Sequence, residues 1–251
     1  MTDVSTGYAI EIRDLSVQAR EGYGRRAVVH EILADVTVKV RRGGSVGIVG
    51  ESGSGKSTLI RAVMDLLPPG MTRVAGEYLL EGRQQWERDR ARAALGVSVA
   101  YIPQDPLSAL NPVLPIFDQV TEVVRLHSDR RLRSLRESVR GYLWRLASRH
   151  AERHAIDLLD RVGIPDPASR TRQFPHEFSG GMRQRVMIAS ALAGNPAVLL
   201  ADEPTTALDA SVERRILDLI NEVKSAGELS LVLVSHDLNV IAWMCEYAYV
   251  F

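Results

Sequence analysis

The chain has 251 residues, a length that suits one large domain or two small ones. Its 31 Lys and Arg residues balance 31 Asp and Glu residues, which argues weakly against a dedicated nucleic-acid-binding protein, because such proteins normally carry a basic excess. The single cysteine, Cys245, excludes a disulfide scaffold. No segment approaches the roughly 20 apolar residues that a membrane-spanning helix needs, and the N-terminus lacks the pattern of a signal peptide.

The first half of the chain predicts strands around one helix. Apolar residues are mostly spaced by two over residues 10–17 and alternate with polar ones over 36–40, the period of half-buried strands. Residues 45–49 are a short buried strand, and residues 58–64 begin a helix that Pro68, Pro69 and Gly70 end. Further strands are expected at 78–82 and 97–102.

The second half predicts helices and then a strand–helix alternation. Apolar stripes at helical spacing run through residues 132–146 and 156–162. A strand at 197–201, a helix at 211–225, a strand at 230–234, a helix at 237–244 and a strand at 246–251 follow. This alternation indicates a parallel sheet covered by helices, with a helical insertion over about 115–190.

A glycine-rich loop joins the buried strand at 45–49 to its helix and fits the P-loop pattern G-x-x-x-x-G-K-[ST]. Its candidate nucleotide contacts are Gly50, Glu51, Ser52, Gly53, Ser54, Gly55, Lys56, Ser57 and Thr58. Glycines let backbone N–H groups curl around phosphate oxygens, and the helix points its positive end at the anion. Lys56 would reach the β- and γ-phosphates, and Ser57 would offer its hydroxyl to Mg²⁺. The alternative is a Gly/Ser-rich surface turn.

An apolar strand at 198–201 ends in two carboxylates, Asp202 and Glu203. Delivering an aspartate from a buried strand beside a phosphate loop is the Walker B arrangement, in which Asp202 would hold Mg²⁺. Glu203 projects the other way and would polarise an attacking water as general base. The alternative is an acidic turn that caps the next helix.

The segment Phe178-Ser179-Gly180-Gly181-Met182 precedes this strand and opens a helix, a second potential anion site. With a P-loop before it and the acidic strand end after it, the order resembles the ATP-binding-cassette ATPases, although their signature usually reads Leu-Ser-Gly-Gly-Gln. The run from Phe174 to Val186 looks like the subgroup that serves oligopeptide, dipeptide and nickel importers. Gln104 matches the Q-loop, Ala207-Leu208-Asp209 the D-loop, and His236 the switch histidine of the family.

The resemblance implies an α/β fold: a P-loop NTPase core with an N-terminal antiparallel β subdomain and a helical insertion subdomain. It implies one ATPase domain over 1–251, divided into 1–104, 105–190 and 191–251. ATP and Mg²⁺ would be the cofactors. In this family Ser57, Gln104 and Asp202 would hold Mg²⁺, Glu203 would position water, and His236 would contact the γ-phosphate. Ser179, Gly180, Gly181 and Asp209 would face the nucleotide of a second subunit.

The resemblance also implies partners: a second ABC ATPase subunit, integral-membrane permease subunits and an extracytoplasmic solute-binding protein. The chain would then sit peripherally on the cytoplasmic face of the inner membrane, with no nucleic acid expected. The first alternative is a nucleic-acid-associated ATPase of the same family, a class that usually carries long coiled coils. The second is a catalytically silent regulatory subunit, which would lack Glu203 or His236.

Three departures from the family pattern stand out. Ala19 occupies the place of the aromatic residue that usually stacks on adenine, and Tyr23 is the nearest substitute. The stretch 125–153 is rich in arginine, which raises contact with nucleic acid or anionic lipid as alternatives, but the apolar stripe at 132–146 favours the solvated face of an amphipathic helix. The strand ending at Phe251 stops where the family normally continues, so we expect either a truncated or an unusually short chain.

Overall fold

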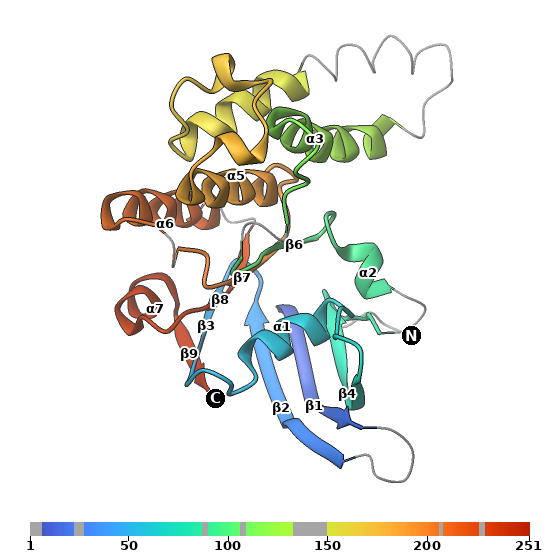
Figure 1. Ribbon diagram of the computed structural model, residues 1–251. Coiled ribbons are helices and arrows are strands. Elements are labelled where there is room, and N and C mark those ends of the chain that lie inside the picture. The colour runs from blue at the N-terminus through green and yellow to red at the C-terminus, as the bar shows by residue number, and fades with distance from the viewer. Residues whose placement is uncertain are drawn as a thin grey trace. The chain divides into compact units, whose positions relative to one another are not determined.

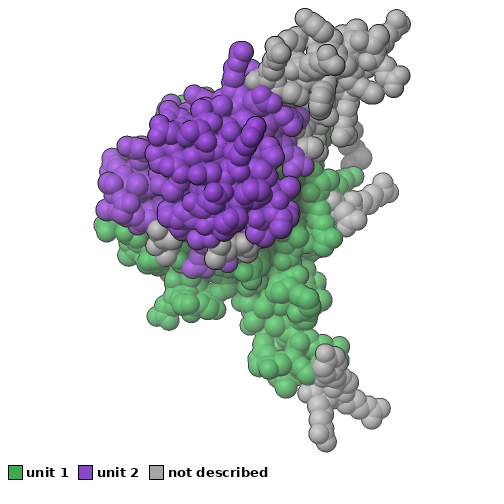
Figure 2. Space-filling view, turned by 45° about the horizontal axis from the view of Figure 1, so that its top comes forward, with its two compact units in different colours: residues 1–99, 197–203, 223–251 green, residues 100–196, 204–222 purple. Residues whose placement is uncertain are grey.

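The computed structural model describes residues 7–22, 28–86, 90–105, 109–132, 150–205, 208–225 and 229–251, with the backbone alone for 126–132. Tyr23, Ala207, most of the apolar stripe at 132–146 and most of the arginine-rich stretch fall outside this part. The chain forms two compact units, shown in green and purple in Figure 2. Unit 1 comprises residues 1–99, 197–203 and 223–251, and unit 2 comprises residues 100–196 and 204–222.

A four-stranded antiparallel sheet in unit 1 has the order β2-β1-β4-β5. Its strands are β1 (Tyr8–Glu21), β2 (Val28–Arg41), β4 (Met71–Leu80) and β5 (Arg83–Gln84). Ile12 in β1 stands opposite Val38 of β2 and Tyr78 of β4, and all three side chains are buried. Apolar side chains of neighbouring strands therefore pack together in a core, and this sheet confirms the predicted N-terminal antiparallel subdomain.

A second sheet has the order β6-β7-β8-β3-β9. Its strands are β3 (Ser45–Val49), β6 (Val99–Ile102), β7 (Val198–Asp202), β8 (Ser230–Val234) and β9 (Tyr247–Val250). The pairs β7–β8, β8–β3 and β3–β9 are parallel. Every residue of β3, β7 and β8 is buried, which explains why these segments are continuous apolar runs without alternation.

In unit 1, α1 (Lys56–Val63) follows β3, α2 (Arg90–Ala94) precedes β6, and α7 (Leu238–Met244) lies between β8 and β9. Helices α1 and α7 follow the predicted segments closely, whereas α2 was not predicted. Asp237 caps α7 by accepting hydrogen bonds from the N–H groups of Asn239 and Val240. These elements can be followed in Figure 1.

Unit 2 is built from helices. They are α3 (Ile116–Leu132), a helix over residues 150–161, α5 (Gly180–Leu192) and most of α6 (Ala210–Ser225), with short 3-10 turns η3 (Pro167–Arg170) and η4 (Pro175–Glu177). Ile116, Val120 and Val124 form the buried face of α3, which packs against α5. Arg125, at the edge of the arginine-rich stretch, pairs with Glu152 at 3.3 Å. Within the described ranges, no helix has the length and apolar character that crossing a membrane requires.

Candidate functional site

The glycine-rich loop lies between β3 and α1, as predicted. Gly55 precedes the helix in a left-handed conformation, with φ of +98°. A Cβ atom there would lie 2.6 Å from Leu33 Cδ2 on β2, so only glycine fits both the backbone and the space. Gly55 provides no side-chain cap, and the first N–H groups of α1 therefore keep their capacity to bind an anion.

Lys56 holds its ammonium group at the centre of this loop. Its Nζ donates hydrogen bonds to the carbonyl oxygens of Gly50 at 2.9 Å and Glu51 at 2.5 Å, and to Ser54 Oγ at 3.3 Å. The residue is only 8% exposed, so its charge acts in a partly desolvated place. The arrangement offers a fixed positive charge and a helix N-terminus to the same incoming anion.

Asp202 ends β7 and is almost fully buried. Burial raises the pKa of its carboxyl group, while a hydrogen bond with Ser57 opposes that rise. A buried carboxylate beside a serine hydroxyl suits Mg²⁺, which proteins usually hold through one or two carboxylates together with substrate phosphates. Ser57 and Asp202 would therefore hold the ion next to the phosphate loop.

Glu203 and His236 meet at the carboxyl ends of two neighbouring strands. Because β7 and β8 are parallel partners, the residues that follow them emerge at the same edge of the sheet. The Glu203 backbone takes a φ of +48°, and its N–H donates to the carbonyl oxygen of Val234 at 2.9 Å. The carboxylate lies 3.4 Å from His236 Nδ1. The pair places a carboxylate beside an imidazole, an arrangement that is suited to general-base chemistry.

The remaining predicted residues belong to unit 2. Gln104 is exposed just after β6. Ser179 is the N-cap of α5, where its Oγ accepts a hydrogen bond from the Met182 N–H at 3.3 Å, and Gly180 and Gly181 form the first turn. Asp209 accepts hydrogen bonds from Ser211 Oγ at 2.7 Å and the Val212 N–H at 3.0 Å, which lower the pKa of its carboxyl group. The roles of these residues toward a nucleotide stay predictions.

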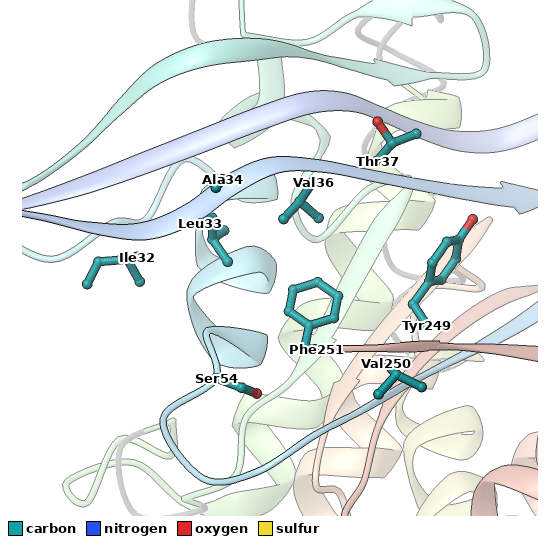
Figure 3. A pocket seen from close by; sticks show the side chains of 9 residues that line it. All are labelled: Ile32, Leu33, Ala34, Val36, Thr37, Ser54, Tyr249, Val250 and Phe251. Carbon is teal, nitrogen blue, oxygen red and sulfur yellow. The ribbon is translucent and has the colours of Figure 1, made fainter.

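One cavity beside the loop was not foreseen from the sequence. It has a volume of about 330 Å³ and is lined mainly by apolar side chains. Figure 3 shows its lining, which comprises Ile32, Leu33, Ala34, Val36, Thr37, Ser54, Tyr249, Val250 and Phe251. These residues come from β2, the phosphate loop and the end of β9, and no local pattern in the sequence indicates that the three segments meet.

The chain belongs to the ABC transporter family, whose model matches residues 33–206. The matched segment includes the phosphate loop, the Ser-Gly-Gly turn and the acidic strand end. This finding agrees with the resemblance drawn from the motifs and their order.

The curated relatives carry the names of peptide transport proteins. The chain is 38% identical over 93% of its length to an oligopeptide transport ATP-binding protein OppD of Bacillus subtilis, and 41% identical over 85% to OppD of Lactococcus lactis subsp. cremoris. It spans 60% and 59% of the lengths of those two proteins. A putative peptide import ATP-binding protein of Brucella abortus is 38% identical over 98% of the chain and 69% of its own length.

Solved structures confirm the fold class. The ATP-binding cassette MJ0796, a dimer in a post-hydrolysis state bound to ADP and Pi, matches with a TM-score of 0.76 and 24% identity, over 96% of this chain and 94% of that one. An ATP-binding subunit of an ABC transporter matches with a TM-score of 0.71 and 28% identity, over 97% and 85%. The α/β cassette fold predicted from the sequence is thereby confirmed.

Proposed function

We propose that this chain is the ATP-binding and ATP-hydrolysing subunit of an importer, and that it energises uptake of peptides, nickel or a related small solute through a separate permease. One observation carries the proposal: a desolvated Lys56, a buried Asp202 bonded to Ser57, and a Glu203–His236 pair all lie at the carboxyl ends of adjacent parallel strands or in the segments that follow them. The names of the relatives support peptide transport over the alternative of a nucleic-acid-associated ATPase.

The phosphate loop would bind the β- and γ-phosphates of ATP. Entering phosphate oxygens would accept hydrogen bonds from Lys56 Nζ in place of the loop carbonyls it now contacts, and from the N–H groups that begin α1. Mg²⁺, held by Ser57, Asp202 and Gln104, would neutralise charge on the phosphates when bound. Gly50 to Thr58 thus serve to bind and orient the triphosphate.

Glu203 would take a proton from the attacking water. A carboxylate is a competent base for this role when it can reach the water that lies in line with the γ-phosphate. His236, at 3.4 Å from Glu203, would orient the carboxylate and donate to the γ-phosphate. The second alternative, a catalytically silent subunit, would not need this pair.

We further propose the assembly that such a role requires. Two copies of the chain, or this chain and a sister ATPase, would pair so that Ser179, Gly180, Gly181 and Asp209 of one face the phosphate loop of the other. The single domain over 1–251 would act with permease subunits and a solute-binding protein outside the cell, at the cytoplasmic face of the inner membrane. The dimeric cassette of similar fold supports the pairing.

The test is an ATPase assay of the purified chain with Mg²⁺ and ATP, in three arms: alone, with double-stranded DNA, and in membranes that contain its permease. We expect hydrolysis that permease membranes stimulate and DNA leaves unchanged. Hydrolysis stimulated by DNA alone would overturn the transport assignment. Failure to bind or hydrolyse ATP in every arm would overturn the ATPase itself.

A further inference from the structure

Arg185, in the second turn of α5, has no place in the chemistry proposed above, yet its side chain joins separate segments of unit 2. Its Nη1 donates a hydrogen bond to the carbonyl oxygen of Gly163, in the turn that follows the helix over 150–161. Its Nε donates to the carbonyl oxygen of Gly181 at 3.3 Å, in the first turn of α5. One guanidinium thus connects the Ser-Gly-Gly turn to a distant part of the helical unit.

The turn at Gly163 leaves space for the Arg185 side chain because it contains a glycine. Gly163 has a φ of +78°, and a Cβ atom there would lie 2.8 Å from Arg215 Nη1 of α6 and 3.3 Å from Arg185 Nη1. Two guanidinium groups therefore approach the same glycine from two helices. A glycine adopts this backbone conformation without strain, whereas a Cβ atom would be strained there and would push the end of the Arg215 side chain aside.

Of these two cations, Arg185 also experiences the negative charge of Asp209. Burial lowers the pKa of Arg185, the charge of Arg215 lowers it further, and the charge of Asp209 raises it. Asp209 itself stays ionised because Ser211 Oγ and the Val212 N–H donate to its carboxylate. Arg185 is therefore linked by hydrogen bonds to the Ser-Gly-Gly turn and by charge to the N-cap of α6.

The residue before Arg185 reinforces the connection between α5 and the segment that ends in Asp209. Gln184 is fully buried, and its Nε2 donates to the carbonyl oxygen of Pro204. Thr205 Oγ1 then donates to Glu213 Oε1 in α6 at 2.7 Å. Consecutive side chains of α5 thus act on this segment, Gln184 through a hydrogen bond at Pro204 and Arg185 through the charge of Asp209.

We propose that Arg185 is a positioning residue that fixes the Ser179–Gly181 turn relative to Asp209, so that these groups present one rigid surface to the nucleotide bound by a partner subunit. This inference rests on the proposed function. Arg185 itself touches no nucleotide. Its loss should weaken ATP-dependent pairing of subunits while leaving the phosphate loop in unit 1 able to bind ATP.

The test uses the full chain with Glu203→Gln, which should bind ATP without hydrolysing it. Arg185→Met removes the hydrogen bonds and the charge, Arg185→Lys keeps the charge, and Arg214→Met is the matched control, an exposed arginine of α6 paired with Asp218. Analytical ultracentrifugation over a range of ATP concentrations measures the dimer, and a fluorescent ATP analogue measures binding to the monomer. Far-UV circular dichroism checks folding.

We expect Arg185→Met to weaken the ATP-dependent dimer roughly tenfold, the size of effect that loss of a charged hydrogen bond produces. The dimer affinity of Arg185→Lys should lie between those of the parent and Arg185→Met, because an ammonium keeps the charge but cannot reproduce the two directed hydrogen bonds of the guanidinium. The affinity of the monomer for the ATP analogue should change by less than about twofold in the Arg185 variants. Arg214→Met should match the parent in both dimer affinity and nucleotide affinity. A purely structural role would instead lower both measurements together.

A double-mutant cycle that combines Arg185→Met with Asp209→Asn tests whether the two residues act together in dimer formation. If Arg185→Met does not fold, Arg185→Lys takes its place in the cycle. If the two residues act together, the dimer affinity of the double variant falls by a smaller factor than the product of the factors for the two single variants. The role of Arg185 would be overturned if the reduction in dimer affinity of the double variant equalled the product of the two single reductions. It would also be overturned if Arg185→Met dimerised like the control. A parent that neither binds ATP nor dimerises with it would overturn the proposed function first.

Discussion

His236 Nδ1 lies 3.4 Å from Glu203 Oε1, across the ends of the neighbouring strands β7 and β8. The Glu203 side chain is 18% exposed and that of His236 is 66% exposed, so the imidazole is accessible from solvent while the carboxylate is largely covered. The pair therefore leaves one side of the imidazole available to a phosphate and keeps the carboxylate in a place where water access is limited.

Replacing Glu203 by Gln should lower kcat for ATP hydrolysis by about 10²–10⁴, the contribution typical of a positioned general base. The amide keeps the size of the side chain but cannot accept the proton. KM and equilibrium binding of ATP should stay close to the parent values, because the phosphate loop is intact. A coupled-enzyme assay and a filter-binding measurement separate the two effects, and undiminished hydrolysis would show that another group is the base.

Replacing Lys56 by Ala should weaken ATP binding by roughly 100-fold, because the loop loses its desolvated cation. Lys39→Ala is the control: its ammonium lies 5.5 Å from the ring centroid of Tyr8, on the antiparallel sheet, and its loss should leave ATP affinity unchanged. Isothermal titration with a non-hydrolysable ATP analogue measures both. Equal affinities in the two variants would contradict the phosphate-loop assignment.

Asp202→Asn should stabilise the nucleotide-free protein at neutral pH. Because burial raises the pKa of Asp202 in the folded state, folding favours its protonated form. The contribution of this carboxyl group to the free energy of unfolding is therefore present below the ordinary Asp pKa. It is lost as the pH rises through the pKa that the group has in the folded state. We expect the melting temperature of the variant to exceed that of the parent by roughly 1–4 °C at pH 7, with the difference vanishing toward about pH 4.

The same variant tests the metal. Mg²⁺ and ATP together should raise the melting temperature of the parent, as a ligand that binds only the folded state does, and should raise that of Asp202→Asn much less. Differential scanning fluorimetry at several pH values provides both readings. A variant that is less stable than the parent at pH 7 would contradict the proposed cost of burying the carboxylate.

Local patterns predict the strands and helices that carry the phosphate loop and the acidic strand end. They do not predict the start of β4: the expected strand begins at Tyr78, whereas β4 begins at Met71. Residues 71–77 lack apolar alternation, and their extended form depends on pairing with β1, for example Arg73 opposite Val17. Tertiary pairing thus overrides weak local preference.

The meeting of Glu203 and His236 follows from the sequence once β7 and β8 are taken as parallel neighbours. The contacts of Arg185 do not, because Gly163 lies 22 residues away in the chain and its carbonyl is brought to α5 by the packing of the helical unit. The apolar cavity near Ser54 has the same origin in long-range packing.

Gly163→Ala should destabilise the protein by about 1–2 kcal/mol, because alanine tolerates a positive φ poorly and its methyl group would displace Arg215. Gly180→Ala is the matched control, since a Cβ there meets nothing within 4 Å and the residue lies in a helix. Urea denaturation followed by circular dichroism measures the free energy of unfolding. A Gly163→Ala variant as stable as the control would contradict the strain argument.

Cys245 should react slowly with thiol reagents in the folded protein. Burial raises the pKa of its thiol to about 12, so little thiolate is present at pH 8. We expect iodoacetamide labelling to be at least roughly tenfold slower than in urea-unfolded protein, as for other thiols with suppressed ionisation. Mass spectrometry at timed intervals gives the rates, and equal rates would show that the thiol is not suppressed.

The hydrogen bonds from Lys56 to the carbonyl oxygens of Gly50 and Glu51 have a consequence for the kinetics of binding. The ammonium group braces the loop in its curved shape before any anion arrives. A triphosphate then exchanges partners with a lysine already in place, and little chain entropy is lost in the encounter. Association should therefore approach the rate of a preorganised site, and differences in affinity between nucleotides should arise mainly from how fast each one leaves.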